Sequence, residues 1–82
     1  MTPEYKALLK TYVPEFDEQG PKWFARCCSH GEDTAAQLQK LGRYADAARA
    51  WDSASHCALG HGRSERYRDA ADRCRKLAVE NK

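Results

Sequence analysis

The sequence predicts an all-α protein, a small bundle of three or four helices with a helical hairpin at its centre. Two observations predict this class: apolar residues recur at helical spacing in successive segments, and no segment shows the alternation typical of a strand. The 82 residues, of which 41% are hydrophobic and 32% charged, suit one globular domain with a thin core. Within it, residues 1–16 form an amphipathic helix and linker, and residues 21–79 form the hairpin and a C-terminal helix.

The first predicted helix follows Thr2, which can cap it, and has Pro3 at its first position. Its apolar face consists of Tyr5, Leu8, Leu9, Tyr12 and Val13. A helix of about ten residues is marginal alone, so this face needs a surface to cover. That surface is either the chain's own hairpin or a second protein. We favour the second, with the helix as a dimerisation element that a target helix can also engage.

The second predicted helix runs from about Pro21 to Leu41 as one long, kinked helix. Its apolar stripe consists of Phe24, Cys28, Gly31, Ala35, Leu38 and Leu41. Ser29 and Glu32 can form a capping box that starts a new helix there, and a glycine is costly inside a helix. Whether Gly31 breaks the helix therefore stays open, although the apolar spacing continues through it.

Two further helices complete the bundle. The third carries on one face Tyr44, Ala47, Ala48, Trp51, Ala54, Ala58 and Leu59, and the sequence GHG ends it. The fourth, capped by Ser64, carries Tyr67, Ala70, Ala71, Cys74, Leu77 and Ala78. Its opposite face alternates in charge at spacings of three or four: Glu65 with Arg68, Asp69 with Arg73, and Asp72 with Lys76. The predicted core consists of Phe24, Leu38, Tyr44, Trp51, Tyr67 and Cys74.

The stretch LGRYADAARAWDSA, residues 41–54, resembles the turn and second helix of a tetratricopeptide (TPR) unit. Gly42 allows the chain to reverse tightly between two helices. The small alanines allow those helices to approach closely, while Tyr44 and Trp51 fill the wider gaps. Because no second repeat of about 34 residues follows, we predict a single TPR-like hairpin with another helix packed on it.

From Phe24 onward the sequence resembles the AraC negative regulator (ANR) family of small bacterial regulators, and in pattern the related PerC-like proteins of mobile elements. The resemblance is carried by LGRYADAA, by Trp51 in AWDSA, and by Tyr67 and Cys74 in RYRDAADRC. A tryptophan is usual in the family where Tyr67 stands. The resemblance implies a cytoplasmic transcription regulator without DNA-reading machinery, which binds an AraC-type activator and blocks its dimerisation or its DNA binding.

The leading hypothesis is therefore a non-enzymatic regulator that acts by protein–protein interaction. The alternatives are a phage or plasmid accessory protein that inhibits another host complex, and a PerC-like activator that contacts DNA directly. No catalytic pair or phosphate-binding loop is recognisable, so neither an enzyme nor a cofactor is predicted. The residues proposed to contact a partner, which includes a second copy of the chain, are Tyr5, Leu8, Leu9, Tyr12, Trp23, Arg66 and Arg73. Acidic residues alternate with the arginines of the last helix, which disfavours a nucleic-acid partner.

Four cysteines and three histidines raise the alternative of a zinc-stabilised module. In an antiparallel hairpin that turns at residues 42–43, Cys27 and Cys28 lie beside Ala58 and Cys57, and His30 lies near Ser55. Cys27 and His30 can therefore converge with Cys57 and His61 on one ion. Their spacing is not a recognised zinc signature, and free cysteine is often a buried core residue, so no metal is predicted. No apolar run is long enough for a membrane span, and no signal-peptide core is present. A cytoplasmic protein with reduced thiols and no membrane partner is expected.

Overall fold

A computed structural model describes residues 2–18, 20–60 and 62–80, and within these ranges it shows four helices and one short β-hairpin. The elements in order are α1 (Pro3–Tyr12), β1 (Phe16–Asp17), β2 (Gly20–Pro21), α2 (Cys28–Lys40), α3 (Tyr44–Cys57) and α4 (Arg63–Glu80). The predicted all-α class is confirmed. The expectation that no strand forms is wrong for β1 and β2, because strands of two residues are too short to show alternation in a sequence.

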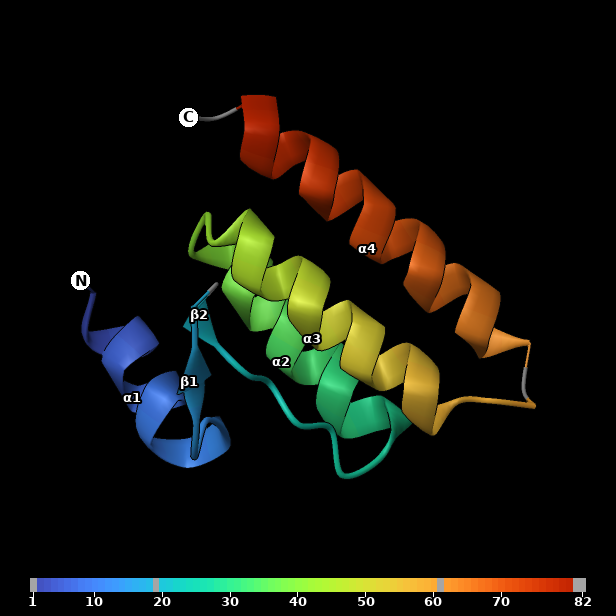
Figure 1. Ribbon diagram of the computed structural model, residues 1–82, viewed down its shortest axis with the longest axis horizontal. Coiled ribbons are helices and arrows are strands. Elements are labelled where there is room, and N and C mark those ends of the chain that lie inside the picture. The colour runs from blue at the N-terminus through green and yellow to red at the C-terminus, as the bar shows by residue number, and fades with distance from the viewer. Residues whose placement is uncertain (1, 19, 61, 81–82) are drawn as a thin grey trace.

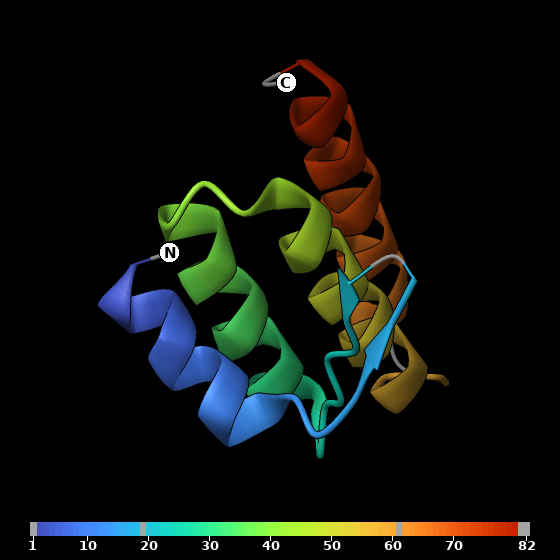
Figure 2. The ribbon, with the colours of Figure 1, turned by 60° about the vertical axis from the view of Figure 1, so that its left-hand side comes forward.

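The helices are arranged around α3. Helices α2 and α3 form the antiparallel hairpin, α4 packs along α3 on its other side, and α1 lies beside α2 (Figures 1 and 2). Gly42 occupies the left-handed backbone region, with φ +75°, at the turn between α2 and α3. Helix α3 is therefore shared between two helical neighbours, and its alanine-rich faces allow both to approach closely.

Helix α1 begins as the sequence predicts, since the Thr2 hydroxyl accepts a hydrogen bond from the backbone N–H of Tyr5 at 3.2 Å. Its predicted intermolecular role is wrong for Tyr5 and Leu8, each of which is only 5% exposed within a single chain. The Tyr5 hydroxyl donates to Asp46 Oδ2 at 2.6 Å, and the guanidinium of Arg43 lies 4.1 Å from the centre of the ring. Helix α1 therefore belongs to the chain's own core.

Helix α2 begins at Cys28 rather than near Pro21, so the longer helix that was expected is wrong at its start. The preceding segment is not helical, and its backbone bonds to other parts of the chain. The N–H of Ala25 donates to Ser53 Oγ at 2.8 Å. In this segment Trp23 is buried at 5% exposure, whereas Phe24 is 52% exposed. Both assignments are corrected: Trp23 is no exposed contact residue, and Phe24 is not core.

Gly31 does not break α2, which continues through it to Lys40. A Cβ atom at this position would lie 2.6 Å from Ala54 Cβ and 2.9 Å from Ala54 Cα, and 2.9 Å from Ala25 Cβ. Gly31 therefore marks a close approach of α2 and α3.

Helix α4 is held to α3 by polar contacts different from those predicted. Ser64 does not cap its own helix but donates a hydrogen bond to the carbonyl of Ser55 at 3.3 Å. Asp72 pairs with Arg75 at 2.8 Å rather than with Lys76, and Arg75 also bonds to Asp52 of α3. The ion pairs therefore connect two helices as well as successive turns of one.

The core consists of two adjoining clusters. The larger contains Tyr5, Leu8, Val13, Trp23, Ala35, Leu38, Ala47, Ala48, Ala50 and Cys74, and the smaller contains Ala54, Ala58 and Tyr67. Of the predicted core, Leu38, Tyr67 and Cys74 are buried, while Tyr44 and Trp51 are half-buried at its edge. Leu59 follows the end of α3 and is exposed, so its predicted place on the apolar face is wrong.

Gly31→Ala is expected to destabilise the protein. In a helix, alanine is more stable than glycine by about 1 kcal/mol. Here, however, its methyl group meets the backbone of Ala54 and forces α2 away from α3, and overpacking of this kind costs about 1–3 kcal/mol. Urea unfolding should show a net loss. Gly62→Ala is the control, because nothing lies within 4 Å of a Cβ at that position. Equal stability of the two variants would contradict the close approach.

Stability is also expected to fall at high pH through Tyr5. Burial and then the hydrogen bond to Asp46 raise the pKa of Tyr5 from 10.0 to about 12. Between these values the unfolded chain releases a proton that the folded chain keeps. The stabilisation is therefore complete below pH 10 and is lost as the pH rises toward 12. Urea midpoints should decrease across this range, and Tyr5→Phe should remove part of the decrease. An unchanged pH dependence in Tyr5→Phe would argue against the buried phenol.

Candidate functional site

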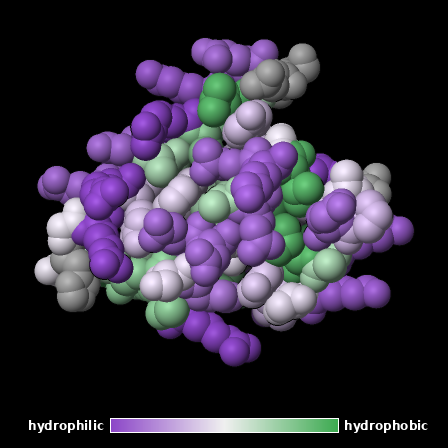
Figure 3. Space-filling view, turned by 180° about the vertical axis from the view of Figure 1, so that it is seen from behind, coloured by the Kyte–Doolittle hydropathy of each residue, from purple (hydrophilic) through white to green (hydrophobic). Residues whose placement is uncertain are grey.

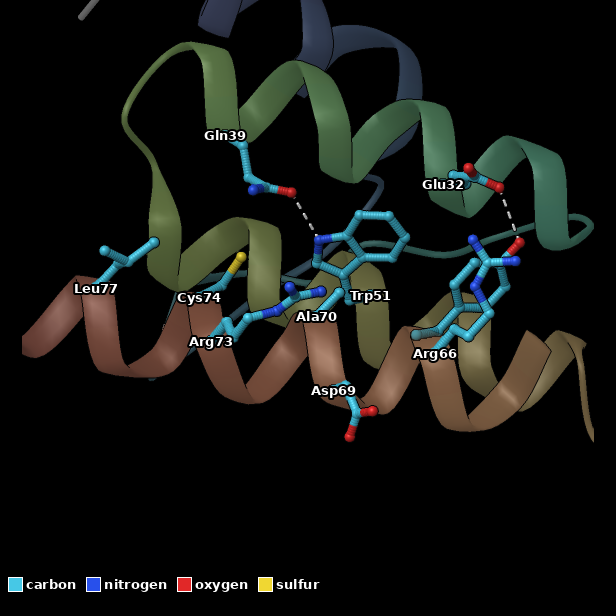
Figure 4. A pocket seen from close by; sticks show the side chains of 10 residues that line it. Glu32, Gln39, Trp51, Arg66, Asp69, Ala70, Arg73, Cys74 and Leu77 are labelled. Carbon is cyan, nitrogen blue, oxygen red and sulfur yellow. Dashed lines mark hydrogen bonds between the residues drawn. The ribbon is translucent and has the colours of Figure 1, made fainter. Parts of the chain in front are cut away.

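A groove of about 420 Å³ lies between α2 and α4, with α3 beneath it (Figure 4). It exists because α2 and α4 each pack on α3 and flank it. Helix α2 contributes Glu32 and Gln39, α3 contributes Trp51, and α4 contributes Arg66, Tyr67, Asp69, Ala70, Arg73, Cys74 and Leu77. We call this the α2–α4 groove.

Two aromatic side chains form the floor of the α2–α4 groove. The rings of Trp51 and Tyr67 lie 5.4 Å apart between centroids and are inclined by 32°. The Trp51 Nε1–H donates to Gln39 Oε1 at 2.9 Å, and the Tyr67 hydroxyl donates to Glu32 Oε2 at 2.9 Å. Both hydrogen bonds connect the floor to α2 (Figure 4). Each ring is therefore held in one orientation by packing on one side and a polar partner on the other.

The titratable groups of the floor stay protonated at neutral pH. Burial, and after it the hydrogen bond to Glu32, raises the pKa of Tyr67. Burial also raises the pKa of the Cys74 thiol, against a weaker opposing effect of its contact with Trp51. A protonated thiol is a poor nucleophile and a poor metal ligand. The Trp51 and Tyr67 rings therefore offer stacking and apolar contact, and the Cys74 thiol beside them is not activated as a nucleophile.

The α4 wall of the groove is positively charged. Arg66 and Arg73 lie seven residues apart, which is about 10 Å along a helix, with Ala70 between them. Neither arginine forms an ion pair within residues 2–18, 20–60 and 62–80. Asp69 points away from Trp51 (Figure 4). The cations beside the floor are therefore available to a molecule that enters the groove.

The residues predicted to contact a partner lie in different parts of the structure. Arg66 and Arg73 line the α2–α4 groove, whereas Tyr5, Leu8 and Trp23 are buried in the core. The two remaining residues, Leu9 and Tyr12, are half-buried along α1, outside the groove.

Glu32 and Gln39 are groove residues that were not predicted. Their spacing of seven residues on α2, matched by that of Arg66 and Arg73 on α4, is the signal that indicates a shared face.

Two of the four candidate zinc ligands form hydrogen bonds with the backbone. Cys57 Sγ donates to the carbonyl of Ala25 at 3.1 Å, and His30 Nδ1 accepts from the N–H of Arg26 at 3.2 Å. His61 lies outside the described residues. The described residues contain no group of three or more His, Cys, Asp and Glu side chains arranged to hold a metal ion. All four cysteines are free thiols in the structure.

No protein-family model, curated protein or solved structure matches the chain. The resemblance to the ANR family therefore stays a prediction. Among the described residues, no helix is both long enough and apolar enough to cross a membrane.

Gln39→Ala is expected to loosen the floor. Loss of the acceptor for Trp51 Nε1–H should lower the free energy of unfolding by about 0.5–1.5 kcal/mol and shift the indole N–H resonance of Trp51. Gln37→Ala is the matched control, because Gln37 is exposed on the same helix and lies outside the groove. Chemical denaturation and ¹⁵N NMR measure both effects. If the two variants behave alike, Gln39 does not orient Trp51.

Proposed function

We propose that the protein is a non-enzymatic regulator that acts by binding another protein in the α2–α4 groove. The observation that carries this proposal is the combination of the Trp51 and Tyr67 floor with the Arg66 and Arg73 wall. Tryptophan, tyrosine and arginine are the residues that most often dominate the energetics of protein interfaces. Here they line one concave surface, where a bound side chain would be shielded from water.

The arrangement of the floor supports this proposal. Because Gln39 and Glu32 already orient the two rings, little side-chain freedom is lost when a partner binds, and preorganisation of this kind favours affinity. The volume of about 420 Å³ is enough to take a few large side chains. Seen from behind, the surface is mostly hydrophilic, with hydrophobic side chains only in small clusters (Figure 3). This face therefore offers no broad apolar interface.

The proposed target is an AraC-type transcription activator in the bacterial cytoplasm. Support comes from an overlap: Trp51, Tyr67 and Cys74, which carry the resemblance to the ANR family, all line the α2–α4 groove. A phage or plasmid accessory protein that inhibits another host complex would use the same surface with a different target. Direct DNA contact of the PerC-like kind is less favoured, because Glu32 lies in the groove with the two arginines and would repel phosphate groups.

Obstruction of the groove is expected to abolish recovery of the target. Ala70→Arg places a long charged side chain between Arg66 and Arg73, whereas Ala45→Arg changes an exposed alanine of α3 outside the groove. Affinity purification from the native host should recover an AraC-type activator with the unmodified protein and with Ala45→Arg, but not with Ala70→Arg. Circular dichroism and melting establish that all three proteins are folded.

A reporter under an activator-dependent promoter provides the functional readout. Expression of the unmodified protein should reduce reporter activity, and Ala70→Arg should restore it. Recovery of DNA alone, or equal recovery of the activator by Ala70→Arg, would contradict the proposal.

A further inference from the structure

This inference rests on the proposed function and concerns the segment of the partner protein that binds in the groove. We propose that the α2–α4 groove receives an acidic amphipathic α-helix of the partner protein. Two carboxylates, about two turns apart on that helix, pair with Arg66 and Arg73, and a large apolar side chain between them packs on Trp51. Three features of the groove support this occupant: the spacing of its cations, the access to its floor, and the composition of its opposite wall.

The first feature is the spacing of the cations. Arg66 and Arg73 lie on one side of α4, and neither has an ion-pair partner among the described residues. By contrast, Arg49 pairs with Asp17 at 2.7 Å, and Arg75 pairs with two carboxylates. A helix that lies along α4 presents residues i and i+7 at the same separation of about 10 Å. Glutamate or aspartate at both positions would form two charge-assisted pairs with the guanidinium groups.

The second feature is the access to the floor between these cations. Ala70 stands four residues after Arg66 and three before Arg73, and its small side chain leaves the half-buried Trp51 ring open to the groove (Figure 4). On the partner helix, residues i+3 and i+4 lie between the two carboxylates on the same face. A leucine or an aromatic residue there reaches Trp51. The pattern complementary to α4 is therefore an acid, an apolar residue one turn later, and a second acid after another turn.

The third feature is the opposite wall. Glu32 stands across the groove from the arginines, and its carboxylate accepts the Tyr67 hydroxyl. Gln39, seven residues further along α2, accepts the Trp51 N–H through its oxygen. This wall carries one negative charge and no positive one. A helix in the groove must therefore place its acids toward α4 and neutral or basic side chains toward α2, which fixes its orientation.

A helix fits this groove better than the other macromolecular ligands. Both walls are helices, and the two strands, β1 and β2, lie outside the groove, so it offers no strand edge to an extended peptide. Helices commonly bind in grooves of this kind through apolar anchors at i, i+3 or i+4, and i+7. A phosphate backbone would bring negative charge against Glu32 as well as toward the arginines. The mixed charge of the two walls matches an amphipathic helix instead.

The test uses the full chain and two synthetic helical peptides of identical length. Both carry leucine at positions i+3 and i+4; one has glutamate at i and i+7, and the other has lysine at these positions. Binding is followed by ¹⁵N NMR at the Trp51 indole N–H and the backbone amides of residues 66–77. The variant R66E/R73E reverses the two groove charges. R68E/K76E makes the same change in net charge on the same helix, outside the groove.

The glutamate peptide should bind the unmodified protein and R68E/K76E with similar affinity. Its affinity for R66E/R73E should be lower by about tenfold or more. The lysine peptide should show the opposite preference and bind R66E/R73E best. The inference would be overturned if the glutamate peptide did not bind, or if both peptides bound the unmodified protein with equal affinity. It would also be overturned if the NMR shifts were confined to other surfaces, or if inorganic phosphate or a DNA duplex displaced the glutamate peptide. If an AraC-type activator is recovered through the groove while the glutamate peptide fails, only this inference is wrong and the proposed function stands.

Discussion

The close approach of α2 and α3 at Gly31 and Ala54 is the constraint on which the rest of the structure depends. Only small residues, Gly31, Ala54 and Ala25, meet at this point of the hairpin. On one side, α1 and Trp23 join residues of the hairpin in the larger core cluster. On the other, Trp51 is only half-buried, and α4 packs beside it without covering it. The α2–α4 groove therefore lies where α2 and α4 flank α3.

The sequence predicts the four helices well because each has an apolar face at regular spacing, and it predicts the cap at Thr2 and the turn at Gly42 because those signals are local. It does not predict where α2 begins. Phe24 continues the apolar spacing of a helix, but Ala25 bonds to Ser53, which lies 28 residues away. Periodicity carries no information about such a distant partner, so Trp23 and Phe24 were assigned to the wrong environments.

The site was only half predictable for the same reason. Arg66 and Arg73 stand out as exposed cations on one helical face, and Trp51 and Tyr67 as large rings at regular spacing. Gln39 and Glu32 offer only their spacing of seven residues, which places them on one face of α2 but gives neither a role. They become part of the site through hydrogen bonds to Trp51 and Tyr67, 12 and 35 residues away. The role of a polar residue that orients an aromatic ring depends on which helices are neighbours, and this arrangement is set by tertiary packing.

The central claim is that the aromatic floor of the groove is already formed in the free protein. Nuclear Overhauser effects in the free, isotope-labelled chain test it directly. The structure predicts contacts between the ring protons of Trp51 and Tyr67, whose centroids lie 5.4 Å apart, and between the Trp51 indole N–H and the side chain of Gln39. Absence of both contacts, together with an indole proton that exchanges as fast as a fully exposed one, would contradict a preformed groove.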